Sequence, residues 1–86
     1  MKLVFTNSAK KELEGLSREM AALFVTHLEK MQDMPPHKHM KYGIPNHVVK
    51  VTKQARIIYN ISEDKIYIVH CFSSHKEYGR WYNSYK

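Results

Sequence analysis

The sequence has little of what would cross-link the chain or carry it through a membrane: one cysteine and no long apolar run. A single cysteine, Cys71, excludes a disulfide within the chain and suits a reducing compartment. It fits a small core residue better than a nucleophile. The opening residues contain no apolar stretch long enough for a signal peptide, and no segment reaches the length of a membrane span. The sequence therefore predicts a soluble, cytoplasmic protein with no membrane contact.

Acidic residues are missing from the middle of the chain. None lies between Pro35 and Ser62, and the whole chain has 14 lysines and arginines against 8 aspartates and glutamates, a formal net charge of +6. A basic stretch of this kind is what phosphate contacts require, because each cation that displaces a condensed counterion strengthens binding to a polyanion. A merely solubilising charge is the alternative. The basic and histidine positions of the stretch are Lys38, Lys41, Lys50, Lys53, Arg56, His37, His39 and His47.

The length and the lack of repeats predict one domain over residues 1–86. A chain of 86 residues has room for a single small core, and it contains no low-complexity run or linker. Such a core leaves little space for a deep interior site. We therefore expect a site on the surface of a sheet, facing a large partner rather than a buried small molecule.

The first half of the chain predicts a strand followed by two helices. Large apolar side chains favour a strand over residues 2–6, and Asn7 or Ser8 can cap a brief helix that ends near Gly15. Ser17 is the expected N-cap of a longer helix, which the prolines after residue 34 end. The positions expected to face inward are Leu13, Leu16, Met20, Leu23, Phe24, His27, Leu28 and Met31.

The second half predicts an antiparallel meander. Residues 47–51, 55–61 and 65–72 are rich in Val, Ile and Tyr and are separated by polar turns. The predicted fold is α+β with the order β-α-α-β-β-β. Two N-terminal helices pack on one face of a small twisted, mainly antiparallel sheet, and a short helix follows at the C-terminus.

A two-residue turn at Glu63 and Asp64 would set the register of the last two strands. The expected pairs are Ile61 with Ile66, Tyr59 with Ile68 and Ile57 with His70. Regular alternation then places His70 in the core, where a change should cost stability rather than activity. Lys50 joins Arg56 on the opposite face if the preceding turn pairs the strands in an even register. The positions expected on that exposed face are Arg56, Ile58, Asn60, Tyr67, Val69 and Cys71.

The C-terminal segment predicts a helix with an aromatic side. Ser74 and Glu77 fit a capping box, so the helix should begin at His75. The positive end of the helix dipole favours the neutral imidazole there, which can accept a proton. The aromatic positions at three- and four-residue spacing are Tyr78, Trp81, Tyr82 and Tyr85, and simple packing against the sheet is the plain interpretation for Trp81.

Two segments are typical of a known family: ARIIYNI in the second meander strand and HCFSSHKEYGRWY from the end of the third. Together with the order of the elements, they extend the resemblance over almost the whole chain. With the predicted order of elements, the sequence resembles the RelE/ParE superfamily of bacterial and archaeal toxins. In that family an arginine followed by apolar and tyrosine residues marks the strand of Arg56, and a lysine lies late in the preceding strand, as Lys50 does here. The ending SHKEY is similar to the TH-x-EY ending of the HigB branch, in which a histidine and a nearby tyrosine belong to the active site.

The sequence departs from that pattern in two places. Many RelE proteins have a second lysine where this chain has Val48. They also have an arginine after the third meander strand, where this chain has His75, with Lys76 and Arg80 nearby.

The resemblance implies the toxin of a type II toxin–antitoxin system: a ribosome-dependent mRNA endonuclease kept silent by an antitoxin. RNA carries its own nucleophile, the 2′-hydroxyl, so cleavage needs a base, cations for the phosphate and an acid for the leaving 5′-oxygen. We expect no metal ion and no cofactor. The expected partners are mRNA on the ribosome and an acidic antitoxin, since a surface of charge +6 attracts one.

The expected catalytic residues are Lys50, Arg56, His75, Tyr78 and Tyr82. The first two would face the phosphate, the histidine would act as base or acid, and a tyrosine would stack on or orient the scissile nucleotide. The residues expected to bind RNA are Lys53, Lys76, Arg80, Lys41 and His47.

Two other functions remain open at this point. A ParE-like toxin would share the fold and inhibit DNA gyrase without cutting RNA, although the histidine and tyrosines of the tail argue against it. A basic RNA-binding module without catalysis is the second.

Overall fold

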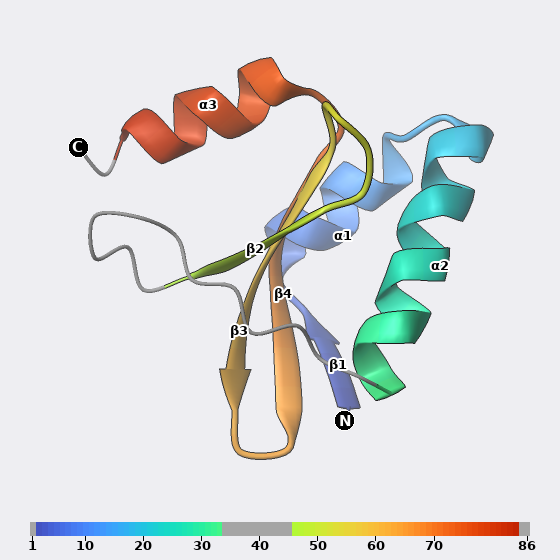
Figure 1. Cartoon of the computed structure of the whole chain (residues 1–86), viewed down its shortest axis with the longest axis vertical. Helices are drawn as coiled ribbons and strands as arrows, with labels where there is room; N and C mark the ends of the chain where they lie inside the picture. The colour runs from blue at the N-terminus through green and yellow to red at the C-terminus, as the bar shows by residue number, and fades with distance from the viewer. Residues whose placement is uncertain (1, 34–45, 85–86) are drawn as a thin grey trace.

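The computed structural model describes residues 2–33 and 46–84, and their arrangement is the predicted α+β fold (Figure 1). The elements are β1 (Lys2–Phe5), α1 (Asn7–Glu14), α2 (Arg18–Asp33), β2 (His47–Lys50), β3 (Arg56–Ser62), β4 (Lys65–Phe72) and α3 (His75–Asn83). The predicted order, including the C-terminal helix that begins at His75, is confirmed. Lys41 and Tyr85, with His37 and His39, lie outside the described residues.

The four strands form one mixed sheet in the order β1-β4-β3-β2. The β1–β4 pair is parallel, and the other two pairs are antiparallel, so the mainly antiparallel sheet is confirmed. Lys50 lies opposite Arg56, which is the even register that places both side chains on the same face.

Helices α1 and α2 cover one side of the sheet, which we call the core face. Ala9 of α1 packs there with Phe24, Leu28 and Met31 of α2 and with apolar residues of β3 and β4. Leu23 was expected to face inward, but it is 44% exposed. At 3.6 residues per turn it lies roughly 100° from the middle of the buried stripe, beyond the width that the sheet covers.

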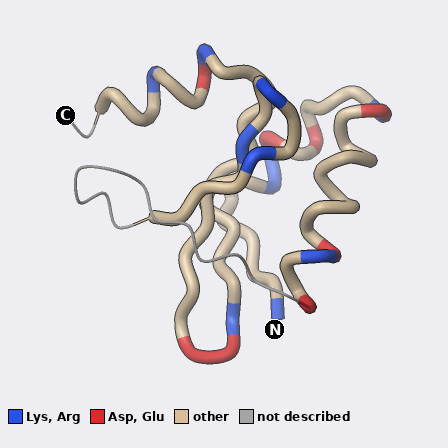
Figure 2. Tube along the Cα trace, viewed as in Figure 1, with Lys and Arg blue, Asp and Glu red and all other residues tan. Residues whose placement is uncertain are grey.

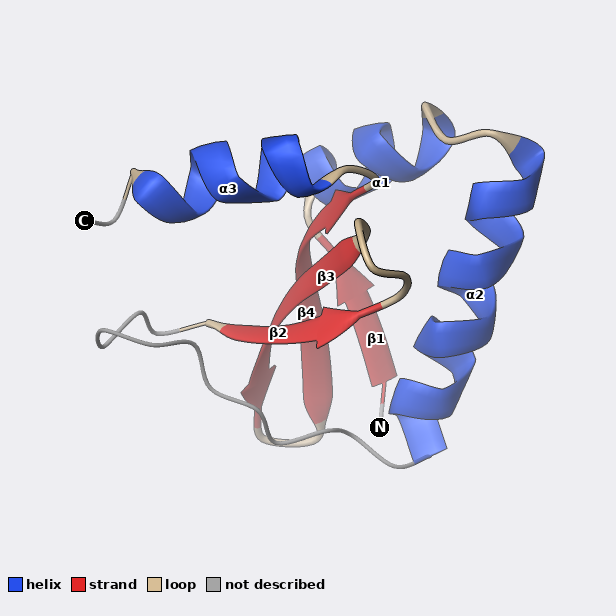
Figure 3. Cartoon of the chain, turned by 45° about the horizontal axis from the view of Figure 1, so that its top comes forward, coloured by secondary structure: helices blue, strands red, loops and turns tan. Residues whose placement is uncertain are grey.

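The opposite side of the sheet, which we call the α3 face, is partly covered at one end. Figure 3 shows α3 crossing the end of the sheet where β4 finishes. Ile58 and Phe72 are buried on this face, with 0% and 6% exposed, although neither belongs to the main core cluster. The face expected to be exposed is therefore partly closed, because α3 brings aromatic side chains over it.

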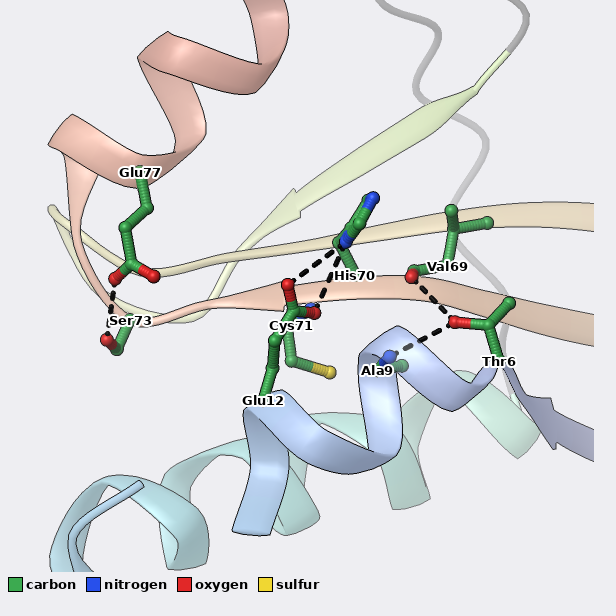
Figure 4. Close-up of polar contacts among 8 residues, drawn as sticks. All are labelled: Thr6, Ala9, Glu12, Val69, His70, Cys71, Ser73 and Glu77. Carbon is green, nitrogen blue, oxygen red and sulfur yellow. Dashed lines mark hydrogen bonds and ion pairs between the residues drawn. The ribbon is translucent and has the colours of Figure 1, made fainter. Parts of the chain in front are cut away.

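Thr6, rather than Asn7 or Ser8, is the N-cap of α1. Its Oγ1 accepts a hydrogen bond from the Ala9 N–H at 3.1 Å and donates one to the Val69 carbonyl at 2.8 Å (Figure 4). The second bond explains the choice, since the Thr6 hydroxyl joins the start of the helix to β4 as well as capping it. Ser17 caps α2 as predicted, because its Oγ accepts from the Met20 N–H at 3.2 Å.

A bulge at Val69 changes the register of the β3–β4 hairpin. Near the turn the pairing is as predicted, with Tyr59 opposite Ile68. Beyond it, however, Ile58 lies opposite His70 and Ile57 opposite Cys71. One extra residue in β4 reverses the faces of the residues that follow. The sequence predictions were therefore wrong for both residues: Cys71 belongs to the core, and His70 lies on the α3 face.

Burial makes the Cys71 thiol a weak acid. Its side chain is 2% exposed, and desolvation, followed by the nearby carboxylate of Glu12, raises the pKa of the thiol from its ordinary value of 9.0 to about 12. The thiol is thus neutral and inert in the folded chain, in agreement with the interpretation as a core residue.

We expect the substitution Thr6→Val to lower the free energy of unfolding by about 1–3 kcal/mol, because it removes a helix cap and the partner of the Val69 carbonyl. Urea denaturation measures this loss. The matched control is Thr26→Val on α2, where the hydroxyl only donates to the Ala22 carbonyl within an exposed helix turn. Its effect should stay within about 0.5 kcal/mol. Equal losses in the two variants would contradict the role assigned to Thr6.

Alkaline pH should test the buried thiol. Below pH 9 Cys71 is protonated in both states, so its contribution to stability is complete. Between pH 9 and 12 the unfolded chain releases this proton while the folded chain keeps it, and stability falls by up to about 1.4 kcal/mol per pH unit. In urea denaturation at pH 8 to 11, Cys71→Ala should show a shallower decline than the wild type. Parallel declines would mean that the thiol titrates normally in the fold.

Candidate functional site

Lysines and arginines meet at the end of the sheet where α3 begins. Figure 2 shows basic positions on the connection between β2 and β3 and along α3, whereas the turn between β3 and β4 is acidic. Lys50 is exposed at the end of β2, and its partner Arg56 begins β3. The two residues with the strongest sequence signal for phosphate contact are therefore side by side on the α3 face.

Arg56 is a structural tie as well as a cation. The residue is buried, with 7% exposed. Its Nη1 donates hydrogen bonds to the carbonyls of Thr52, Lys53 and Ala55 at 3.1, 2.9 and 3.1 Å. Its guanidinium carbon also lies 5.4 Å from the centre of the Tyr78 ring, a cation–π distance. Arg56 thus fixes the β2–β3 connection and holds it against α3.

The β2–β3 connection in turn fixes the start of α3. Thr52 Oγ1 accepts from the backbone N–H groups of Gln54 and Ala55 at 3.2 and 3.0 Å, which folds the connection tightly. The Gln54 side-chain oxygen accepts from the His75 N–H at 3.4 Å. Lys53 projects as an exposed residue from this braced turn.

The predicted N-cap of α3 at Ser74 is confirmed, and Glu77 reaches back to serine hydroxyls. Ser74 Oγ accepts from the Glu77 N–H at 3.2 Å, and it donates to Glu77 Oε1 at 3.0 Å. Ser73 Oγ donates to the same carboxylate oxygen at 3.2 Å (Figure 4). His75 consequently stands exposed in the first helical turn, with its ring centre 5.9 Å from that of Tyr78.

The aromatic side of α3 divides into two parts. Trp81 packs on the sheet, with ring centres 5.9 Å from Phe72 and 5.6 Å from His70, as the packing interpretation predicted. Tyr78 and Tyr82 lie beside each other at 5.9 Å, half-buried, with Tyr78 next to Arg56. Burial raises the pKa of the Tyr78 phenol, and Tyr82 adds to this rise, whereas Arg56 opposes it. Tyr78 therefore remains a neutral hydrogen-bond donor at physiological pH.

We call the end of the α3 face with Lys50, Arg56, His75 and Tyr78 the α3 corner. The other residues expected to bind RNA lie at different distances from the α3 corner. Lys76 and Arg80 are exposed on α3. His47 lies at the far end of β2, opposite Tyr59, and its ring stacks on that of Tyr59 at 5.1 Å. Because Tyr59 belongs to the core cluster, His47 is directed to the core face, away from Lys50.

Sequence reasoning missed one polar pair. Glu12 of α1 accepts from Nδ1 of His70, at 3.3 Å to Oε1 and 3.1 Å to Oε2, and its Oε1 also accepts from the Cys71 N–H at 2.9 Å. The His70 ring stacks on Phe72 at 4.8 Å. The only sequence signal was the presence of a histidine late in a strand, since nothing local joins residues 58 positions apart.

The described segments provide no candidate metal site: no group of three histidine, cysteine, aspartate or glutamate side chains in them is placed to hold an ion. In those segments, too, none of the helices has the length and apolar character needed to cross a membrane.

Comparisons of sequence find no matching protein family and no matching curated protein. Solved structures do match. The isolated RelE toxin of E. coli superimposes with a TM-score of 0.73 at 13% identity, covering 99% of this chain and 98% of that chain. The intact E. coli RelBE toxin–antitoxin complex gives 0.71 at 15% identity, covering 81% and 92%.

A third structure, the YoeB/ParE toxin from Agrobacterium tumefaciens, gives a TM-score of 0.69 at 17% identity and covers 83% of this chain and 95% of that chain. At such identities a likeness establishes the fold. The fold implied by the resemblance of the segments ARIIYNI and HCFSSHKEYGRWY is thus confirmed: the chain has the fold of the RelE and YoeB toxins.

Proposed function

We propose that the protein is the toxin of a type II toxin–antitoxin system and cleaves mRNA on the ribosome without a metal ion. The observation that carries the proposal is the convergence of Lys50, Arg56, His75 and Tyr78 at one corner of the α3 face. The fold shared with RelE and YoeB toxins supports it. The sequence features of the tail favour a nuclease over a gyrase inhibitor.

The chemistry needs proton transfer and positive charge, and the end of the α3 face where α3 begins offers one proton carrier, two cations and two tyrosines. The 2′-hydroxyl attacks the adjacent phosphorus once a base takes its proton, and the leaving 5′-oxygen needs an acid. Lys50 and Arg56 supply positive charge for the pentacoordinate phosphate. His75 is the exposed proton carrier beside them. Tyr78 or Tyr82 offers an aromatic face on which a nucleobase can stack.

The bracing of Arg56 suits this role. A single guanidinium nitrogen, Nη1, donates hydrogen bonds to three backbone carbonyls. Because the guanidinium group is planar and rigid, these bonds fix the position of the whole group. A cation held rigidly needs no reorganisation when charge develops on the phosphate. The same contacts mean that loss of Arg56 disturbs the β2–β3 connection, so its substitution tests structure and chemistry together.

The proposed protein partner is an acidic antitoxin. Several of the matching structures are complexes of a toxin with its antitoxin, among them E. coli RelBE and Staphylococcus aureus YoeB–YefM. The formal charge of +6 and the basic α3 corner favour an acidic chain that neutralises them. The proposed nucleic-acid partner is mRNA held in the ribosome.

Substitution of His75 should separate the nuclease from its rivals. We expect His75→Ala to lower the rate of mRNA cleavage on translating ribosomes by about 10²–10⁴-fold, as loss of a general acid or base does. Primer extension on the message measures the cuts. The matched control is His27→Ala on α2, whose ring nitrogen Nδ1 bonds the Leu23 carbonyl one turn earlier in the same helix.

Three outcomes would count against the proposal. Intact message together with inhibited DNA supercoiling by the wild type would indicate a gyrase inhibitor. Growth arrest that persists in His75→Ala with unchanged RNA binding would indicate a binding module. An equal loss in His75→Ala and His27→Ala would indicate a general structural effect.

Salt dependence should identify the phosphate contacts. We expect Lys53→Ala to weaken RNA binding and to reduce the slope of log affinity against log salt by about 0.7–0.9, the value for one lost phosphate contact. Filter binding to a single-stranded RNA at several salt concentrations measures the slope. Lys10→Ala, at an exposed position of α1, is the control and should leave the slope unchanged. Equal slopes in all three proteins would remove Lys53 from the interface.

A further inference from the structure

The bulge in β4 turns His70 toward the proposed site. In a strand without a bulge, Val69 would take a regular place after Ile68 and alternation would direct His70 to the core. Because Val69 is bulged out of the pairing, His70 lies opposite Ile58 on the α3 face. Bulges are common next to active sites, where they redirect a single side chain. Here the redirected side chain is a histidine 21% exposed, next to the helix that carries His75.

Glu12 fixes the tautomer of His70. A carboxylate oxygen only accepts hydrogen bonds, so the proton of the neutral imidazole must be on Nδ1, which faces Glu12 at 3.1 Å. The Cys71 N–H holds the carboxylate in place from the backbone of β4. Figure 4 shows the other ring nitrogen, Nε2, pointing away from Glu12. Nε2 therefore has the lone pair of a base.

His70 is a neighbour of Arg56 across the β3–β4 pair. Arg56 lies opposite Phe72, and Ile58 lies opposite His70, so Arg56 and His70 are diagonal neighbours on adjacent strands. The Cα atoms of such neighbours are about 7–8 Å apart, so the two side chains start within reach of one nucleotide. The Trp81 ring contacts the rings of both His70 and Tyr78, so His70 lies beneath the part of α3 that carries these two aromatic residues.

We propose that His70 is a second catalytic histidine, the general base of RNA cleavage, and that Glu12 is its positioning residue. This inference rests on the proposed function. His70 Nε2 takes the proton of the 2′-hydroxyl while the 2′-oxygen forms a bond to phosphorus. The bond between phosphorus and the 5′-oxygen breaks, and the leaving oxygen takes a proton from His75. The products are a 2′,3′-cyclic phosphate and a 5′-hydroxyl end, and water restores both histidines.

A purely structural role is the competing explanation, since His70 also stacks on Phe72 and Trp81. The two roles differ in which ring nitrogen matters. Packing and the bond to Glu12 use the ring and Nδ1, whereas the base uses Nε2. The substitution His70→Asn separates them, because its amide can still donate to Glu12 but has no group at the position of Nε2.

The test is single-turnover cleavage on ribosomes programmed with a synthetic mRNA, either normal or with sulfur replacing the 5′-oxygen of the scissile bond. A thiolate leaves without protonation, so the sulfur substrate compensates for a missing acid but not for a missing base. We expect His70→Asn to be slower by about 10²-fold or more on both substrates. His75→Ala should be slow on the normal substrate and recover on the sulfur substrate. His27→Asn is the matched control.

The results can contradict this inference without touching the proposed function. Suppose that the wild type cleaves the message and that His70→Asn is folded. If this variant then cleaves at the normal rate, or recovers on the sulfur substrate, the base assignment is overturned. If the wild type itself leaves the message intact, the proposed function fails instead. Should His70→Asn not fold, Glu12→Gln decides. It keeps an acceptor for the Cys71 N–H but no longer fixes the tautomer, and we expect about a 10-fold or larger loss. A normal rate in folded Glu12→Gln would overturn the inference.

Discussion

The arrangement of this protein depends on the place where β1 stops. The strand pairs with β4 only as far as Ile68, and the backbone groups of β4 beyond that point need other partners, because an unsatisfied buried group costs about 1–3 kcal/mol. Thr6 supplies a hydroxyl to the Val69 carbonyl, and Glu12 supplies a carboxylate to the Cys71 N–H. These two contacts join the start of α1, the bulge at Val69 and the orientation of His70 in one local arrangement.

The α3 corner is built from a second set of dependent contacts. Arg56 draws the carbonyls of the β2–β3 connection around one guanidinium nitrogen, and Gln54 on that connection meets the start of α3. The helix then places His75 and Tyr78 beside the lysine and arginine of the strands. Arg56 is thus fixed by contacts to the backbone, and the start of α3 is fixed through Gln54, whereas Lys50 is an exposed side chain. On the same side of α3, Trp81 packs beside Tyr78 and contacts the His70 ring, so the helix that carries His75 also covers His70.

Much of the fold could be predicted because its signals are local. Alternating Val, Ile and Tyr marked the strands, and the capping box of Ser74 and Glu77 marked the start of α3. The register near the turn at Glu63 followed from the length of the turn. The prediction failed at His70 and Cys71, because a bulge has no composition of its own and one extra residue exchanges the two faces. It also failed at the cap of α1, where Thr6 was selected by a carbonyl 63 residues away.

The sequence by itself determined the order of the elements and the basic middle of the chain, and it predicted a candidate site of Lys50, Arg56, His75, Tyr78 and Tyr82. Periodicity, capping residues and charge act over a few neighbouring positions, so they can be recognised without coordinates. Only the tertiary structure decided that Arg56 is tied to the β2–β3 connection and that Glu12 meets His70. These contacts join segments that are separate in the sequence, and their geometry depends on where one strand ends and where another gains a residue.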